Sequence, residues 1–304
     1  MSLFVASNLA DAHGHRNPLH NCVAIKARYA DGLLKVYQTG DAVINGSDED
    51  FLYGGNTDPV VRVGDTVRRL LQPWSPRVRE LLVRLRDVGF DDAPYPFGTD
   101  ERGRDVFTYV PGEVGHYPWT PAVGSEAALI SAGRLLRRFH DATVDVAGRW
   151  RGGWRWPARE PVEVICHNDF APYNCVFVGD QARGIFDFDT AGPGPRSWDL
   201  AYALYRFAPL TSGRHNGAPA SSYVQGTRAR AFLDAYGADQ QLRIGALNHV
   251  VPRLTALTTF MREAADGGDE NFARHIADGH LDLYLADIDH VTAHTTEWIA
   301  KLVE

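Results

Sequence analysis

One short β-rich segment, set in a second half with mostly helical patterns, constrains the fold most. Residues 162–189, VEVICHNDFAPYNCVFVGDQARGIFDFD, place a short strand, EVIC, and a later hairpin strand, GIFDFD, on either side of a polar loop. The stretches 125–143 and 228–301 have apolar residues at helical spacing, with glycine-containing breaks in the longer one. We expect a mixed helix-and-sheet fold in which this segment pins a loop between strands, because functional side chains concentrate on such loops.

The chain before this segment has the pattern of a small sheet lobe. VVRVGDTVRRLL (60–71) predicts a β-hairpin around a Gly-Asp turn, and APYPFG and DVFTYV predict two more strands. Between them WSPRVRELLVRLRDVGF predicts a helix that Ser75 caps. One face of that helix is apolar: Val78, Leu81, Leu82 and Leu85. The sequence PGE at 111–113 then interrupts the pattern and marks the end of the lobe.

Composition excludes several classes of protein. The 304 residues include 31 Lys and Arg against 38 Asp and Glu, which gives a formal net charge of -7. Nucleic-acid binding needs a basic face, and a membrane helix needs about 20 consecutive apolar residues; the sequence has neither. Its three cysteines form no CxxC pair, which argues against a zinc ribbon or a disulfide framework. We therefore expect a cytoplasmic protein with no nucleic-acid or membrane partner.

The polar loop of the β-rich segment has the residues of a magnesium-dependent site. Asp169 and Asn174 lie five positions apart in it, and the hairpin strand brings Asp187 back beside them. Two carboxylates and a carboxamide supply the oxygen ligands that Mg²⁺ prefers, with one acid left over as a base. This spacing predicts a magnesium site with an acid beside it, and it is the pattern that protein kinases use.

The pattern H-x-D-x-x-x-x-N, followed by IFDFD and then WDLA, resembles the aminoglycoside phosphotransferase and choline kinase family. The resemblance runs from about Tyr53 to the C-terminus, and FTYVPGE and LLRRFHD also match it in order. It implies an α+β, bilobal protein-kinase-like fold, with a small N-terminal β-sheet lobe and a larger, mainly helical C-terminal lobe. It also implies a phosphotransferase that uses ATP (or GTP) and Mg²⁺ and has a small-molecule hydroxyl as acceptor.

The resemblance implies a role for each residue of the loop region. Asp169 would accept or orient the proton of the acceptor hydroxyl, while Asn174 and Asp187 would hold Mg²⁺. Three further residues would support the site: His167, Asp189 and Asp199. His167 would brace the loop and Asp199 would anchor it from below. For Asp189 a second metal contact and an ion pair with an arginine such as Arg196 both stay open.

The nucleotide side of the site departs from the family pattern. The backbone of Thr108, Tyr109 and Val110 would bind adenine. The third strand offers no lysine, so we expect Arg68 to bind phosphate and Glu80 to be its ion-pair partner. VAIK at 23–26 matches the tetrapeptide that usually includes this lysine, but it precedes the Gly-Gly segment, so we interpret it as a coincidence.

The acceptor is the least determined part of the prediction. By the resemblance, acidic residues near the C-terminus attract cationic acceptors, and the candidates in a break between helices are Asp266, Asp269 and Glu270. An aminoglycoside-like antibiotic is favoured, which would make the protein a resistance enzyme. The alternatives are a metabolite kinase for choline, homoserine or a sugar, and a degenerate kinase that binds nucleotide without turnover.

We predict three parts for the chain, which we expect to be a monomer or a homodimer. Residues 1–50 are an N-terminal extension of open role, and 51–112 are the nucleotide-binding lobe with a hinge near 109–113. Residues 113–304 are the catalytic and substrate-binding lobe.

Overall fold

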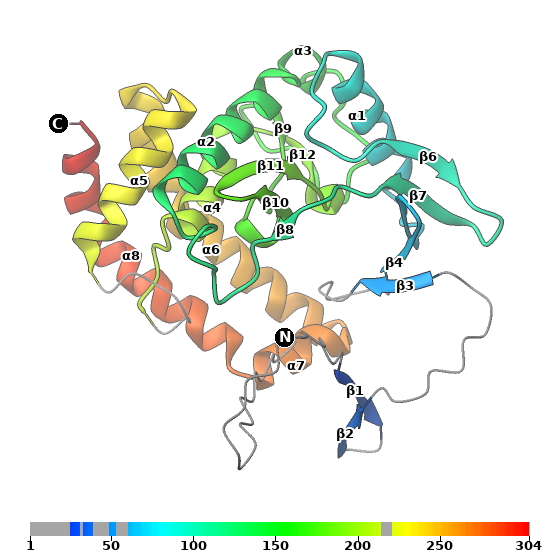
Figure 1. Cartoon of the computed structure of the whole chain (residues 1–304). Coiled ribbons are helices and arrows are strands. Elements are labelled where there is room, and N and C mark those ends of the chain that lie inside the picture. The colour runs from blue at the N-terminus through cyan, green and yellow to red at the C-terminus, as the bar shows by residue number, and fades with distance from the viewer. Residues whose placement is uncertain (1–24, 31–32, 39–48, 53–59, 214–220, 304) are drawn as a thin grey trace, which may run out of the picture.

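The computed structural model describes residues 25–30, 33–38, 49–52, 60–213 and 221–303. Its first half contains a five-stranded antiparallel sheet with the strand order β3-β4-β5-β7-β6 (Figure 1). The strands are β3 (Glu49–Leu52), β4 (Val60–Val63), β5 (Thr66–Leu70), β6 (Pro96–Thr99) and β7 (Arg104–Thr108). Gly64 forms the turn between β4 and β5 with a φ of 58°, a conformation that favours glycine. The hairpin and the two later strands expected from the sequence are confirmed.

Helix α1 (Ser75–Asp87) crosses from β5 to β6 and packs its apolar face inward. The four residues expected on that face are all buried: Val78, Leu81, Leu82 and Leu85. The predicted cap is wrong, because Trp74 is the N-cap residue and Ser75 lies inside the helix. The Ser75 hydroxyl instead accepts from the Gln72 N–H at 3.0 Å and donates to the buried Asp105 carboxylate at 2.5 Å.

The connection from β7 to the second half of the chain is tightly packed. It leads into β8 (Glu113–Val114), which pairs with β10 (Cys175–Val178), and β10 pairs with β11 (Gln181–Ile185). Gly112 in this connection has a φ of 146°, and a Cβ added to it would lie 2.3 Å from the Val176 side chain. Only glycine fits between the connection and β10.

The predicted β-rich segment is present, although its second strand ends earlier than expected. Strand β9 (Val164–Cys166) corresponds to EVIC and pairs with β12 (Gly192–Gly194), while β11 stops at Ile185. Short 3₁₀ turns follow at Pro172–Asn174 and Phe188–Thr190. Asp187 has a φ of 64°, which takes the chain out of strand geometry just before the second turn.

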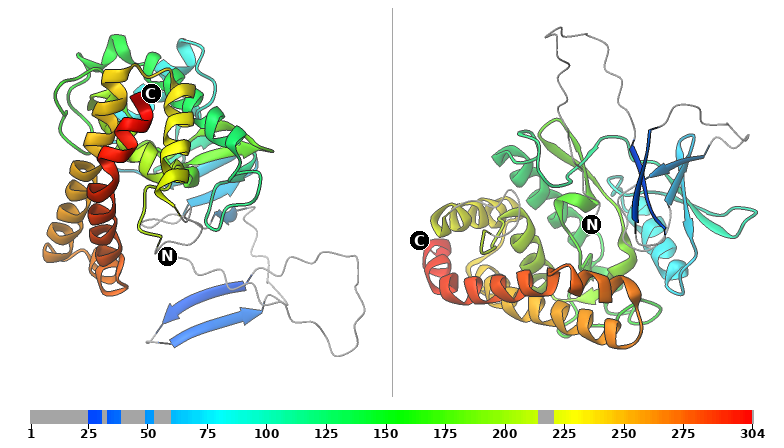
Figure 2. Two further views of the ribbon diagram at one scale, coloured as in Figure 1. Left: turned by 90° about the vertical axis from the view of Figure 1, so that its left-hand side faces the viewer. Right: turned by 90° about the horizontal axis from the view of Figure 1, so that it is seen from below.

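Helices form the rest of the described chain (Figures 1 and 2). They are α2 (Glu126–Asp141), α3 (Val144–Ala147), α4 (Arg196–Phe207), α5 (Ser222–Tyr236), α6 (Gln240–Asp266), α7 (Glu270–Ala277) and α8 (His280–Val303). Helix α6 packs against both α4 and α8, and α2 packs against α5. Gly133 permits that last contact, because an added Cβ would lie 2.7 Å from the Phe232 carbonyl oxygen. The continuous core under these helices fixes the loop that follows β9.

Strands β1 (Ile25–Ala30) and β2 (Leu33–Gln38) form a separate two-stranded sheet. Lys26, the last residue of the VAIK tetrapeptide, lies in β1 opposite Tyr37 and so is not part of the five-stranded sheet. The other expectations for residues 1–50 lie mostly outside the described residues. Within the described part of the chain, no helix has the length and apolar character needed to cross a bilayer.

Candidate active site

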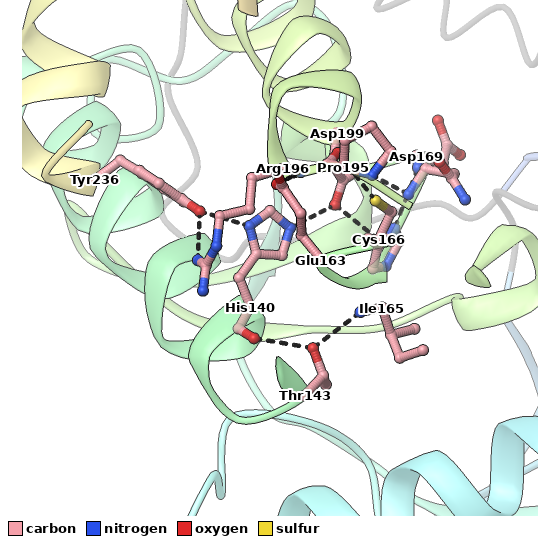
Figure 3. A network of polar contacts seen from close by, with 12 residues as sticks. His140, Thr143, Glu163, Ile165, Cys166, Asp169, Pro195, Arg196, Asp199 and Tyr236 are labelled. Atoms are coloured by element: carbon pink, nitrogen blue, oxygen red, sulfur yellow. Dashed lines mark hydrogen bonds and ion pairs between the residues drawn. The ribbon is translucent and has the colours of Figure 1, made fainter. Parts of the chain in front are cut away.

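Asp199 on α4 anchors the loop that follows β9 (Figure 3). Its carboxylate accepts from the N–H groups of His167 and Asn168, both at 2.7 Å, and lies 3.0 Å from His140 Nε2. Desolvation opposes the charge, but the hydrogen bonds from His140 and His167 lower the pKa of Asp199 below its ordinary value. These are the contacts expected of an anchor below the loop.

A fully buried histidine supports that anchor from α2. Burial lowers the pKa of His140 despite the neighbouring Asp199, so the imidazole is neutral near pH 7. Its Nε2–H then donates to Asp199, and its Nδ1 accepts from the Tyr236 hydroxyl at 2.7 Å. Tyr236 in turn accepts from Arg196 at 2.8 Å, as Figure 3 shows.

His167 connects the loop to the segment before Asp187. Its Nδ1 accepts from the Asp169 N–H at 3.3 Å, and its Nε2 donates to the Phe186 carbonyl at 3.0 Å. The Phe186 N–H donates to the Asn174 carbonyl at 3.0 Å. The three predicted residues Asp169, Asn174 and Asp187 are therefore held on two segments that hydrogen bonds tie together.

The Asp169 carboxylate is held on both of its oxygens. Oδ2 accepts from Asn174 Nδ2 at 2.8 Å, and Oδ1 accepts from the Tyr173 hydroxyl at 2.8 Å. The same Asn174 nitrogen also donates to the Asp169 carbonyl at 2.9 Å. Because both Asn174 hydrogen bonds come from its nitrogen, its amide oxygen is the atom suited to a cation.

The carboxylates that follow the hairpin repel one another. Desolvation and the charges of Asp189 and Asp169 raise the pKa of Asp187 to about 6, although half of its side-chain surface is exposed. Given that exposure, we regard the two neighbouring carboxylates as the effective cause. Such crowding suits a bound divalent cation, which would offset the repulsion. Within the described residues no three His, Cys, Asp or Glu side chains form a closed metal cage, so a metal here would also need other oxygen ligands.

The arginine beside these carboxylates is Arg69, and the prediction of Arg68 is wrong in geometry. Arg69 Nη1 lies 2.5 Å from Asp189 Oδ1 and 3.9 Å from Asp187 Oδ1. Arg68, on the opposite face of β5, contacts Thr66 and lies 3.7 Å from Asp100. Successive strand residues face opposite ways, so an error of one position reversed the assignment.

Two partner predictions also need correction. Glu80 forms its ion pair with Arg77, at 2.5 Å, and not with Arg68. Arg196 pairs with Asp141, at 2.7 Å, and so is not the arginine beside Asp189. The ion pair of Asp189 is with Arg69.

The Arg69 guanidinium has N–H groups that form no hydrogen bond with the described residues. Its Nε and Nη2 are buried and have no hydrogen-bond partner among the described residues, and its other nitrogen contacts Asp189. Unpaired buried donors are costly unless a ligand meets them. A planar fork of N–H groups next to a candidate metal site fits a phosphate oxygen.

The expected adenine-binding segment has one available donor among the described contacts. The Thr108 N–H donates to the Tyr95 carbonyl at 2.9 Å, and the Tyr109 N–H to the Asp65 carbonyl at 2.8 Å. Neither is therefore open to a base. Of the three expected residues, this leaves Val110 as the one whose N–H has no hydrogen-bond partner in the described part of the chain.

The acidic residues expected at the acceptor site lie far from Asp169 along α6. Asp269 caps α7 by accepting from the N–H groups of Asn271 and Phe272. Asp266 ends α6, 13 residues beyond Arg253, which is about 20 Å of helix; Glu270 follows in α7. Arg253 itself donates to the carbonyl of Asn168 at 2.6 Å, directly beside Asp169. The charged side chain of α6 that reaches the loop is therefore a cation.

Sequence reasoning missed four further residues near Asp169: Tyr173, Tyr202, Arg206 and Arg253. Tyr202 and Arg206 lie three and seven positions after Asp199 on α4, and thus on the same face of the helix. That spacing was a usable signal, since Asp199 was already expected under the loop. Arg253 gave no such signal, because nothing local relates it to residues 85 positions earlier.

Comparisons with known proteins agree with this geometry. The profile of the phosphotransferase enzyme family matches residues 144–243. Over 213 residues the chain is 34% identical to the trifolitoxin immunity protein of Rhizobium leguminosarum bv. trifolii, covering 67% of this chain and 80% of that one. The chain belongs to the phosphotransferase enzyme family. It is thus a family member with the small-molecule kinase fold.

Two other proteins are similar to part of the chain or to its fold. A homoserine kinase of Bradyrhizobium sp. strain BTAi1 is 33% identical over 101 residues, which cover 33% of this chain and 26% of that kinase. The crystal structure of a choline/ethanolamine kinase family protein from Mesorhizobium loti superposes with a TM-score of 0.57 at 17% identity, covering 86% of this chain and 94% of that one. The second similarity confirms the bilobal protein-kinase-like fold of the phosphotransferase.

Proposed function

We propose that this phosphotransferase moves the γ-phosphoryl group of ATP to a hydroxyl group of a small molecule, with Mg²⁺ as cofactor. The observation that supports this most is the Asp169 carboxylate, held on both oxygens by Tyr173 and Asn174 beside Asp187 and Arg69. A carboxylate fixed in this way is suited to accept or orient a hydroxyl proton. The family match and the order of the sheet strands support the same reaction.

Each part of the site has one task in this proposal. Asn174 and Asp187 hold Mg²⁺, and the bound metal ion neutralises part of the negative charge of the phosphates. Arg69 donates to a phosphate oxygen with the N–H groups that lack protein partners. Residues 51–112 bind the nucleotide, with the Val110 N–H directed to the adenine. Positioning and electrostatics then supply most of the rate.

Of the acceptor classes, a hydroxylated metabolite with a carboxylate, such as homoserine, has more support than an aminoglycoside. Arg253 is the charged α6 side chain beside the loop, whereas Asp266 and Asp269 are distant or engaged in capping. A cation next to Asp169 repels polycationic acceptors and attracts carboxylates. The homoserine kinase similarity is in keeping with this choice.

A second candidate function is immunity through phosphorylation of a toxin. It rests on the relative whose printed name is an immunity protein, which matches two thirds of this chain. The catalytic step would be the same, with a hydroxyl of the toxin as acceptor. The two candidates therefore differ only in what reaches Asp169.

The test is acceptor-dependent ATP consumption with Mg²⁺, measured for L-homoserine, choline, sugars and a set of aminoglycosides. We expect turnover with L-homoserine that is lost in Asp169→Asn and weakened in Arg253→Ala through a higher KM for the acceptor. Turnover with an aminoglycoside and not with homoserine would contradict the acceptor choice alone. Full activity in Asp169→Asn would contradict the proposed reaction.

A further inference from the structure

A half-buried arginine, Arg206, lies on the far side of the tyrosine that contacts Asp169. The carbon centre of Arg206 on α4 lies 4.8 Å from the ring centroid of Tyr205, 5.2 Å from Tyr202, 5.5 Å from Tyr173 and 5.8 Å from Tyr284. Within the described part of the chain no carboxylate lies at ion-pair distance from it. Four aromatic rings and their hydroxyls surround a positive charge that has no direct counter-ion there.

Hydrogen bonds join this cation to Asp169 through two phenols. Arg206 Nε and Nη2 lie 3.1 and 3.0 Å from the Tyr202 hydroxyl oxygen. The Tyr202 and Tyr173 hydroxyls are 2.9 Å apart, and the Tyr173 hydroxyl is 2.8 Å from Asp169 Oδ1. All four links are within ordinary hydrogen-bond distance.

Counting protons fixes the direction of every link. An ionised Asp169, which the proposed function requires, has no proton to give, so Tyr173 donates its single hydroxyl proton to Oδ1. The Tyr173 oxygen must then accept from the Tyr202 hydroxyl, which donates its only proton in this hydrogen bond. The Tyr202 oxygen can only accept from Arg206, and a guanidinium only donates. The hydrogen bonds therefore all point one way, from the Arg206 guanidinium to the Asp169 carboxylate.

We infer that Arg206, Tyr202 and Tyr173 are positioning residues for Asp169, acting as one donor chain that fixes the orientation of its carboxylate. The inference rests on the proposed role of Asp169 and deepens it. A chain of donors that ends at a charge strengthens each of its links. With Oδ1 taken by Tyr173 and one side of Oδ2 by Asn174, the lone pairs left to Asp169 define where an acceptor hydroxyl can approach.

The protonation states of the phenols agree with the chain. Burial raises the pKa of Tyr173 and of Tyr202 well above the ordinary value, so both hydroxyls keep their protons near pH 7. The charged groups that face them are Arg206 and Asp169 at the two ends, and Arg253 over the Tyr202 ring at 4.5 Å. The Tyr284 hydroxyl lies 3.0 Å from Arg206 Nη2 and faces the same cation.

The test is a double-mutant cycle on phosphoryl transfer to L-homoserine and, without any acceptor, on Mg²⁺-dependent ATP hydrolysis. We expect Tyr173→Phe to lower kcat about tenfold and Tyr202→Phe about threefold, with KM for ATP within about twofold of wild type. The double variant should be no slower than Tyr173→Phe, because the effects of substitutions at two residues of one hydrogen-bonded series do not add. Arg206→Met should resemble Tyr202→Phe, and Arg206→Lys should recover most of the loss.

Tyr205→Phe is the matched control. Tyr205 also packs on Arg206 from α4, but its hydroxyl donates to Asp287 at 2.8 Å and takes no part in the chain. We expect its kcat to stay within about twofold of wild type. Additive losses in the double variant, or an unchanged kcat in Tyr173→Phe, would overturn the inference. Asp169→Asn separates the two proposals: if it keeps full activity, the proposed function fails, and if it alone is inactive, only the donor chain fails.

A spectroscopic measurement tests the chain without turnover. Phenolic protons that are held in hydrogen bonds exchange slowly and give proton NMR signals away from the amide region. We expect one signal lost in Tyr173→Phe and another in Tyr202→Phe, and we expect Tyr173→Phe also to shift the remaining Tyr202 signal. A Tyr202 signal that stays in place when the Tyr173 hydroxyl is removed would contradict the chain.

Discussion

Arg69 and Arg68 are neighbours on β5 with opposite surroundings, so they form a natural pair of variants. Arg69 has buried donors without a protein partner beside Asp189, while Arg68 contacts Thr66 on the other face. We expect Arg69→Ala to weaken ATP binding at least about tenfold, the value of one charge-assisted contact, and Arg68→Ala to change it less than about twofold. Titration with a fluorescent ATP analogue measures both. The opposite order would restore the original assignment of Arg68.

Metal binding should depend on the ionisation of Asp187. Its pKa is raised to about 6, and a metal ligand must be deprotonated, so below pH 6 each metal ion has to displace a proton. We expect the affinity for Mn²⁺, a spectroscopic substitute for Mg²⁺, to fall about tenfold per pH unit below 6 and to be level above 7. Electron paramagnetic resonance of free Mn²⁺ gives the affinity. Equal affinities at pH 5 and 7 would exclude Asp187 as a ligand, and Asp187→Asn should bind poorly at both.

For single residues, the sequence predicted which residue types gather at the candidate site better than it predicted which way their side chains point. Asp169, Asn174 and Asp187 could be found because their spacing within one loop and hairpin is local. Arg69 could not, since a strand alternates its faces and no local feature says which of two adjacent arginines points toward the site. Arg253 lies 85 positions from its contact with Asn168, and only the packing of α6 on α4 brings it there.

A buried aspartate joins α1 to the central sheet. Asp105 on β7 is fully buried, accepts from Ser75 at 2.5 Å, contacts Arg79 on α1 and lies 4.0 Å from Arg69 Nε. The carboxylate of Asp105, which lies near Arg69, therefore comes from a strand, and helix α1 contributes a second cation, Arg79.

Removing the charge of Asp105 should loosen both contacts at once. We expect Asp105→Asn to lower the free energy of unfolding by about 2–4 kcal/mol, because it removes the carboxylate that pairs with the partly buried Arg79 and one of the carboxylates near Arg69. Urea unfolding measures the loss. Asp65→Asn is the control: its side chain is fully exposed and its ion pair with Arg62 spans 3.8 Å, so its free energy of unfolding should equal that of wild type within the error of the measurement. A loss for Asp105→Asn as small as for the control would refute this role.

The helices and strands themselves were largely predictable. Helix α1 has its apolar residues at helical spacing, and Ser125 begins α2 by accepting from the Ala128 N–H, as its sequence indicates. The residues at which helices and strands begin and end were less predictable. Ser75 looked like a cap because serine often is one, but its hydroxyl is used by Asp105, a tertiary contact 30 positions away.

Across the whole molecule, the buried network of His140, Asp199 and Tyr236 should make folding sensitive to mild acid. The pKa of folded His140 is lowered below 6.5, so on acidification the unfolded chain takes up a proton before the folded one does. Stability is then lost as pH falls through 6.5, with a slope of at most about 1.4 kcal/mol per pH unit. Asp187 acts in the opposite sense, because its raised pKa favours the folded state on acidification below 6.

The contribution of His140 is isolated by comparing wild type with His140→Gln. We expect the free energy of unfolding of wild type to fall more steeply between pH 7 and 5 than that of the variant, since glutamine does not titrate. Urea unfolding at several pH values supplies both curves. Parallel curves would mean that His140 takes up its proton at the same pH in the folded and unfolded states, which would contradict the lowered pKa. The overall fold was predictable because the order of its motifs is that of a known family, whereas this network was not, since it joins α2, α4 and α5.

The close packing of Gly112 on β10 determines where the molecule can bend. Immediately after Gly112, β8 pairs with β10, the strand that directly follows Asn174. The chain from 112 onward therefore moves with the loop that follows β9. Any rocking of the five-stranded sheet must pivot on residues 109–111, and hydrogen–deuterium exchange should be faster at Val110, whose N–H has no partner among the described residues, than at 113–114. That pivot includes Val110, the residue proposed to bind adenine. A bound nucleotide would therefore stiffen the joint it occupies.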